Sequence, residues 1–180
     1  MSEQLPLLRH PQPCQEGVRA VVVEAVAAVQ EAYGAGRLDI VTEADLQGHL
    51  FAALAARLEG TPIPLHAWLP LKGEPGPVDL VIGSNSVAIE LKLEARYPEM
   101  PSTKKNRVDW KLAREDFKKL GRLLSRGGVQ HGYFVMLNES GAHLTQPEVR
   151  ELWVSAGGSR AEARWLFVEI IVELPTITGS

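Results

Sequence analysis

The sequence predicts an α/β protein built around a mixed β-sheet. Three observations carry this prediction: some segments place apolar residues at helical spacing, others form short apolar runs typical of strands, and both kinds are interspersed along the chain. The 180 residues suit a single domain over 1–180, because one hydrophobic core commonly reaches this size before a chain divides. The 45% of hydrophobic and 23% of charged residues are typical of a globular protein.

Two helices are expected first. Residues 17–33 are rich in Ala and Val and stop at Gly34, which predicts a buried helix within an N-terminal extension, 1–41. A second helix follows, in which Thr42 can cap the first turn and Asp45 completes an approximate capping box. The apolar stripe of this helix consists of Leu46, Leu50, Leu54 and Leu58.

Three strands are expected next, at 65–71, 78–82 and 87–93, and the last two form a hairpin. A helix over 108–126 follows, and then a strand over 132–137. The buried stripe of that helix is expected to contain Ala113, Phe117, Leu120 and Leu124.

The C-terminal part, 139–180, is expected to hold a helix and a strand. Residues 145–156 have weak helical periodicity. Residues 165–174 are apolar on both faces, which indicates a central or well-covered strand.

Charged residues interrupt the two strands of the hairpin. A symmetric turn would place Asp79 directly opposite Glu90, where side chains lie about 4.5–5.5 Å apart and like charges repel. Because side chains alternate between faces, Lys92 shares the face of Glu90. A divalent cation such as Mg²⁺ would bridge both carboxylates and lower the pKa of a bound water. Alternatively, the three residues line the wet side of the hairpin, with Glu90 and Lys92 as a weak surface pair.

The same residues form a recognisable motif. P-V-D at 77–79 is followed, after ten residues, by E-L-K at 90–92, and this pattern resembles the bipartite motif of the PD-(D/E)XK nuclease superfamily. The restriction-endonuclease-like core of that superfamily is a helix, three strands, a helix and a strand, which matches the expected order over 42–138. The resemblance implies a Mg²⁺- or Mn²⁺-dependent nuclease that hydrolyses phosphodiester bonds in DNA.

The resemblance also implies roles for individual residues. Asp79 and Glu90 would bind the metal, and Lys92 would activate or orient the attacking water. The backbone carbonyl of Leu91 would be a further metal ligand. Many members place a Glu near the start of the first core helix, reaching the metal directly or through water, and Glu43 fits that position. Glu43 is also expected on the core-facing side of its helix, although a first-turn acid could equally serve the helix dipole.

Basic residues are concentrated in one segment. Residues 104–126 contain nine Lys or Arg and only three acidic residues, whereas the whole chain has a net charge of −3. Such a surplus suits a phosphate backbone, although a solvated helix face is favoured from charge alone. The segment D-F-K-K-L at 116–120 is similar to a polar pattern that nucleases of the superfamily often carry, but Asp116 and Lys119 are spaced to pair on the helix surface. The candidate nucleic-acid contacts are Lys104, Lys105, Lys111, Arg114, Lys118 and Lys119.

The sequence also predicts binding partners and a cellular location. DNA is the expected partner, and both a homodimer and a protein partner that supplies specificity stay open. A second hypothesis is a catalytically inactive domain of the same fold that binds nucleic acid or a protein partner. The chain starts without a secretory signal, and no segment approaches the roughly 20 apolar residues of a membrane span, so a cytoplasmic location without membrane insertion is expected. The tryptophans are expected in or beside the core rather than as base-stacking platforms: Trp68, Trp110, Trp153 and Trp165.

Overall fold

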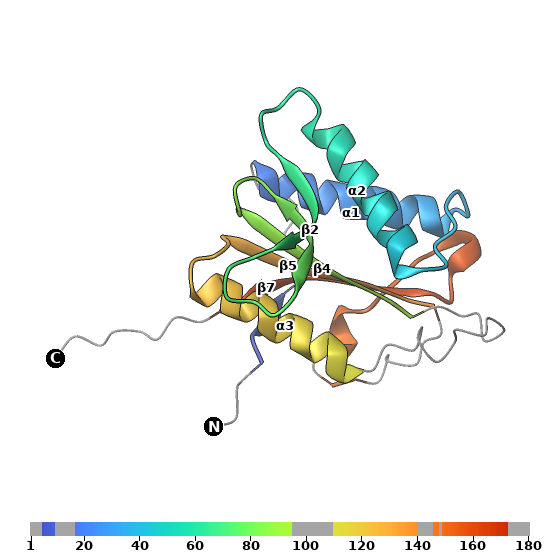
Figure 1. The fold of residues 1–180 in the computed structure, drawn as a ribbon. Coiled ribbons are helices and arrows are strands. Elements are labelled where there is room, and N and C mark those ends of the chain that lie inside the picture. Colours follow the sequence, from blue (N-terminus) through green and yellow to red (C-terminus); the bar gives the residue numbers. More distant parts are fainter. Residues whose placement is uncertain (1–4, 10–16, 95–109, 140–145, 148, 173–180) are drawn as a thin grey trace.

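The computed structural model describes residues 5–9, 17–94, 110–139, 146–147 and 149–172. Within these ranges the protein is an α/β fold with three α-helices and one mixed sheet of seven strands, which confirms the predicted class. Two helices cover one face of the sheet and the third covers the other face, so the fold has three layers (Figure 1).

The two N-terminal helices lie over the same face of the sheet. Helix α1 spans Val18–Gly34 and helix α2 spans Glu43–Leu58. The Thr42 hydroxyl accepts a hydrogen bond from the Asp45 backbone N–H, and the Asp45 carboxylate accepts one from the Thr42 N–H, so the predicted capping box is complete. The predicted stripe of α2 is buried against the sheet: Leu46, Leu50, Leu54 and Leu58.

Three strands follow α2 in the predicted order: β2 (Leu65–Pro70), β3 (Pro77–Ile82) and β4 (Val87–Glu94). β2 pairs with β3, and β3 with β4, both antiparallel. β2 forms one edge of the sheet.

The turn between β3 and β4 has the predicted symmetric register. Ile82 pairs with Val87, and Leu80 therefore pairs with Ile89. Asn85 in the turn takes a positive φ of 65°, a conformation that Asn tolerates better than most residues. The hairpin therefore directs Glu90 and Lys92 to one face of β4, as the sequence predicts. In β3 the regular alternation breaks at Asp79, because Val78 and Val81 belong to the same core beside α3.

Helix α3 (Trp110–Ser125) and strand β5 (His131–Asn138) complete the predicted core order. β5 lies parallel to β4, which requires a crossover such as α3 between them. In the predicted stripe of α3, Leu124 is only partly buried and Leu123 is buried in its place. The remaining three members are buried as expected: Ala113, Phe117 and Leu120.

The predicted helix at 145–156 is wrong. Its described residues contain a 3₁₀ turn, η1 (Arg150–Leu152), and a two-residue strand, β6 (Val154–Ser155). Pro147 disfavours the α conformation in the residue before it, and β-branched side chains favour extended backbone. Gly157, with a φ of 73°, then turns the chain.

The last strand confirms its prediction within the described residues. After a second 3₁₀ turn, η2 (Gly158–Arg160), strand β7 spans Arg164–Ile171 and is buried along most of its length. Residues 173–174 of the predicted strand lie outside the described ranges. A further strand that the sequence did not predict, β1 (Leu7–Arg9), pairs with β7.

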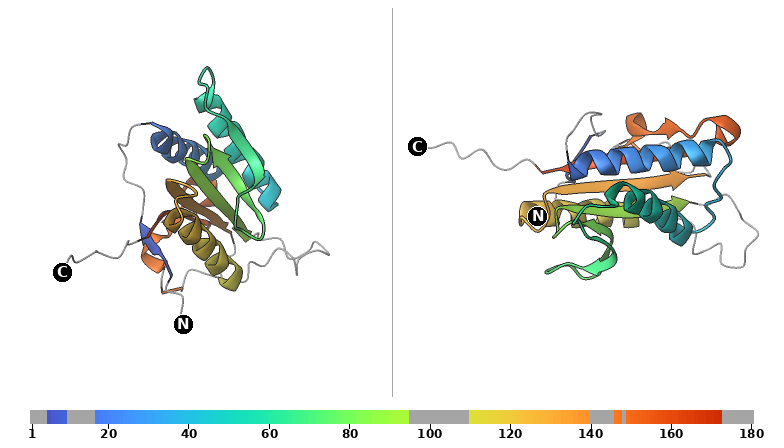
Figure 2. Two further views of the ribbon diagram at one scale, coloured as in Figure 1. Left: turned by 60° about the vertical axis from the view of Figure 1, so that its left-hand side comes forward. Right: turned by 90° about the horizontal axis from the view of Figure 1, so that it is seen from above.

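The strand order across the sheet is β1-β7-β5-β4-β3-β2, with β6 beside β7. Side chains of β4 alternate between two cores: Ile89 and Leu91 face α1 and α2, whereas Ala88 faces α3. Glu90 and Lys92 share the face of Ala88 and project toward α3. Figure 2 shows these layers from two further directions. Among the described residues, no helix combines the length and the apolar character needed to cross a bilayer.

Candidate active site

The candidate site lies where β3 and β4 separate. The ladder between β3 and β4 ends at the pair of Leu80 and Ile89. Asp79 and Glu90 are the next residues beyond that pair, and their backbones do not pair. The Asp79 carboxylate instead accepts a hydrogen bond of 2.7 Å from the Leu91 backbone N–H. A side chain, rather than the backbone of β3, therefore satisfies this N–H group and fixes the half-buried Asp79 in the gap.

Glu90 is buried and lies against a lysine from α3. Its exposed fraction is 2%, and its Oε1 lies 2.6 Å from the Nζ of Lys119. Lys119 also donates a hydrogen bond to the carbonyl of Pro77 at the start of β3, so one ammonium group joins β3, β4 and α3. The Lys119 ammonium lowers the pKa of Glu90, but burial and the neighbouring carboxylates outweigh this effect.

Lys92 is held between two helices from opposite faces of the sheet. Its Nζ lies 3.0 Å from Asp116 Oδ2 on α3 and 3.7 Å from Glu43 Oε1 in the first turn of α2. The same ammonium donates a hydrogen bond of 2.9 Å to the Leu91 carbonyl. The first turn of α2 and the carboxyl end of β4 lie at the same end of the sheet (Figure 1). Lys92 is therefore positioned by acids on both sides of the strand that carries it.

The site holds more acids than bases. Burial, together with the Asp79 and Asp116 carboxylates, raises the pKa of Glu90 to about 8. Burial likewise raises the pKa of Glu43 and of Asp116, and the opposing effect of Lys92 does not cancel it. All three changes favour the protonated carboxyl, first because burial disfavours the charged form. The four carboxyl groups are those of Glu43, Asp79, Glu90 and Asp116, and the two ammonium groups are those of Lys92 and Lys119.

The oxygens of this site suit a hard divalent cation. Mg²⁺ prefers oxygen ligands and typically keeps several waters beside one or two carboxylates. Asp79, Glu90 and the Leu91 carbonyl offer such a set. Within the described ranges, no three side chains of His, Cys, Asp or Glu are gathered as a ready-made metal site. A dication there would compete with Lys119 for Glu90 and with Lys92 for the Leu91 carbonyl.

The structure brings together the residues that the motif predicts, but two interpretations of them are wrong. Glu90 and Lys92 do not form a surface pair, because Glu90 is buried and its cation is Lys119. Asp116 and Lys119 do not pair with each other along α3, because they contact different residues of β4. Sequence reasoning named Asp116 only within the D-F-K-K-L pattern and Lys119 only as a nucleic-acid contact, and it assigned neither to the site. The signal for Asp116 is its position beside the buried stripe of α3, which turns it toward the sheet.

The predicted nucleic-acid contacts are only partly covered by the structure. Lys104 and Lys105 lie outside the described residues. Lys111 and Arg114 are exposed on α3, and Lys118 is half-buried there. The first two therefore lie on the outer side of the helix that borders the site.

Two arginines of the basic segment have a structural role. The side chain of Glu74 is fully buried, and its Oε2 lies 2.8 Å from Arg122 Nη2. Arg126 Nη1 lies 3.4 Å from the other oxygen of the same carboxylate. These ion pairs hold α3 against the loop that precedes β3, so part of the positive surplus at 104–126 serves packing.

One tryptophan contradicts its predicted location. Trp165 and Trp110 are buried and Trp153 is partly buried against the α3 side of the sheet, as expected. Trp68, in contrast, is 64% exposed on the edge strand β2. The strand periodicity of the sequence could not reveal this exposure. The backbone at Trp68 has a positive φ of 55°, so its side chain departs from the regular alternation between the two faces of the sheet.

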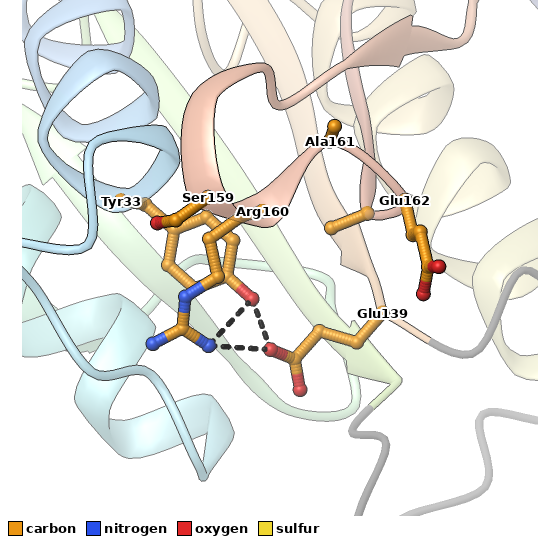
Figure 3. Close-up of a pocket in the computed structure, with 7 residues that line it drawn as sticks. Tyr33, Glu139, Ser159, Arg160, Ala161 and Glu162 are labelled. Atoms are coloured by element: carbon orange, nitrogen blue, oxygen red, sulfur yellow. Dashed lines mark hydrogen bonds and ion pairs between the residues drawn. The ribbon is translucent and has the colours of Figure 1, made fainter.

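A hollow of about 610 Å³ lies elsewhere, between the end of α1 and the segment before β7 (Figure 3). The guanidinium of Arg160 lies over the ring of Tyr33, 4.6 Å from its centroid, and 3.4 Å from Glu139. The Tyr33 hydroxyl donates a hydrogen bond to Glu139. Figure 3 shows these three groups pointing at one another. They satisfy one another and fasten α1 to the C-terminal part of the sheet, which explains the cluster without a ligand.

Comparisons of the chain with protein-family models, with curated proteins and with solved structures found no match in any of the three. A function for this protein must therefore be inferred from the site itself and from the motif that its residues form.

Proposed function

We propose that the protein is a Mg²⁺- or Mn²⁺-dependent nuclease that hydrolyses phosphodiester bonds in DNA. The observation that carries this proposal is the partly buried excess of carboxyl groups where β3 and β4 separate, in which Glu90 has a pKa of about 8. A dication would compensate that excess, and the ammonium of Lys92 beside it would face the negative charge of a phosphate. Lys111 and Arg114 on the adjacent helix would extend the contact along the phosphate backbone.

The order of elements supports the restriction-endonuclease-like fold that the motif implies. A helix, three strands, a helix and a strand follow one another from α2 to β5, with the motif residues on β3 and β4. The Asp79 carboxylate lies in the gap that the separation of these two strands leaves. In this proposal β1, α1, β6 and β7 are additions around a PD-(D/E)XK core.

The proposed chemistry assigns a task to each side chain. When bound, the dication would supply a water of lowered pKa and would neutralise charge on the phosphate. Asp79, Glu90 and the Leu91 carbonyl would hold it, with Glu43 reaching it directly or through water. Burial lowers the pKa of Lys92, but the neighbouring carboxylates outweigh burial and raise it overall. Lys92 would therefore stay protonated, orient the water and stabilise developing negative charge, rather than accept a proton.

The direct test is cleavage of labelled DNA by purified protein. Duplex, single-stranded and branched substrates, and RNA, would be incubated with Mg²⁺ or Mn²⁺ and, separately, with chelator. Asp79→Asn, Glu90→Gln and Lys92→Met should each lower metal-dependent cleavage by at least about 100-fold. Glu31→Gln is the matched control, because this carboxylate on α1 is 78% exposed and lies outside the site. Cleavage by Asp79→Asn at the wild-type rate would refute the assignment.

One observation favours a second candidate, a domain that binds nucleic acid without cutting it. Asp79 already accepts a hydrogen bond from the Leu91 N–H, and Glu90 already lies against Lys119. A scaffold without chemistry would keep such contacts permanently. It would bind DNA equally well with a dication or with chelator, and it would cleave none of the substrates.

A further inference from the structure

Trp68 occupies an unusual place next to the proposed metal ligands. It lies on the edge strand β2, and its two neighbours pair with the residues on either side of Asp79: Ala67 with Leu80, and Leu69 with Val78. The ladder is interrupted between these pairs, so Trp68 lies across from Asp79 without pairing with it. An exposed indole is therefore held on the strand adjacent to the one that carries the carboxylate.

The positive φ at Trp68 lets the edge strand change faces, because Leu65 packs on the α1 and α2 side whereas Leu69 and Leu71 pack on the α3 side, but it leaves the indole itself outside the core. A positive φ is uncommon for a bulky side chain and is sterically unfavourable, and here φ is 55°. A strained residue usually persists because its surroundings impose it, and such residues cluster at functional sites. Since 64% of Trp68 is exposed, burial of the indole is not what compensates the strain.

Hydrogen bonds fix the indole relative to the site. Trp68 Nε1 donates a hydrogen bond of 2.8 Å to the side-chain oxygen of Gln47. The side-chain nitrogen of Gln47 in turn donates one of 2.8 Å to the backbone carbonyl of Asp79. One side chain of α2 thus connects the indole to the residue that would hold the metal, while the ring stays open to solvent.

We propose that Trp68 stacks on an unpaired base of the strand that is cut, so that the preferred substrate is single-stranded or locally unpaired DNA. This inference rests on the proposed nuclease function and deepens it. Every base offers a π face to an aromatic ring, whereas bases within a duplex are already stacked on their neighbours. An indole fixed beside Asp79 places such a base close to the phosphate that is to be hydrolysed.

Binding can be measured separately from cleavage in the Glu90→Gln protein. The affinity of this protein for a labelled single-stranded oligonucleotide and for the matching blunt duplex would be compared by fluorescence anisotropy in Mn²⁺. Adding Trp68→Ala should weaken single-strand binding by about 5-fold to 150-fold and leave duplex binding unchanged. Adding Trp68→Phe should retain most of the affinity, because an aromatic face is kept. Val154→Ala, which truncates another exposed apolar side chain, is the control and should change neither affinity.

The outcomes separate this inference from the proposed function. Three results would each overturn the role of Trp68. Single-strand binding could be unchanged in Trp68→Ala, or Trp68→Ala could lose affinity equally for both DNA forms. The Glu90→Gln protein with Trp68 intact could also show no detectable single-strand binding. Wild-type protein that cuts no DNA, together with single-strand binding that depends on Trp68, would overturn the nuclease and leave the stacking role standing. Cleavage by the wild type, together with DNA affinities that do not change in Trp68→Ala, would overturn the stacking role and leave the nuclease assignment standing.

Discussion

Replacing Glu90 by Gln should make the metal-free protein more stable at alkaline pH. The pKa of Glu90 rises from an ordinary value of 4.5 to about 8 in the folded protein, first because the carboxyl is buried and then because Asp79 and Asp116 lie nearby. Between these pH values the folded state binds more protons than the unfolded state. The free energy of unfolding therefore falls as pH rises through this window, and Gln, which does not ionise, escapes that loss.

The size of the effect follows from the same two pKa values. At about 1.4 kcal/mol per pKa unit, full ionisation of Glu90 costs the folded state on the order of 5 kcal/mol. At low pH, where the carboxyl is protonated in both states, Glu90 should behave much like Gln. Between about pH 5 and pH 9, the stability advantage of Glu90→Gln should grow by about 4 kcal/mol.

Urea unfolding followed by circular dichroism, at a series of pH values in chelator, measures this advantage directly. Glu31→Gln should follow the wild type throughout, because that carboxylate is exposed. Adding Mn²⁺ at pH 8 should stabilise the wild type by about 2.7 kcal/mol at 100 times the dissociation constant, but not Glu90→Gln. Parallel stability curves for the wild type and Glu90→Gln would refute the raised pKa of Glu90 in the folded protein.

Three other substitutions test separate parts of the structure. Asp116→Asn removes the carboxylate 3.0 Å from Lys92, so kcat for DNA cleavage should fall by about 10-fold to 100-fold with little change in KM, and an unchanged kcat would contradict the positioning role. Trp68→Gly should be more stable to urea than Trp68→Ala by about 1 kcal/mol, because Gly accepts a φ of 55°, and the opposite order would show that the strain is absent. Leu50→Ala should cost about 2–5 kcal/mol of unfolding free energy, because Leu50 is 1% exposed in the core, and a near-neutral effect would contradict that packing.

The local parts of the fold could be predicted because short-range physics determines them. The capping box of Thr42 and Asp45 follows from side chains three residues apart. The hairpin register follows from the turn, and it assigns Glu90 and Lys92 to one face. The helix predicted at 145–156 failed because its periodicity was weak and Pro147 opposed it.

The parts of the site that escaped prediction depend on contacts between distant elements. Lys119 reaches Glu90, and Asp116 reaches Lys92, only once α3 is packed against β4, which spacing along α3 does not specify. Trp68 was assigned to the core or its edge because large aromatic side chains are usually buried there. Its exposure depends on a single backbone dihedral, which the sequence of β2 does not reveal.

Calorimetric titration of the wild-type protein with Mn²⁺ at pH 7, repeated in buffers of different ionisation enthalpy, addresses the carboxylate site most directly. We expect one dication to bind and close to one proton to be released, because Glu90, with a pKa of about 8, is mostly protonated before the metal arrives. Glu90→Gln should bind far more weakly and release no proton. Absence of binding to the wild type, or binding of equal strength to Glu90→Gln, would contradict a dication site built on Asp79 and Glu90.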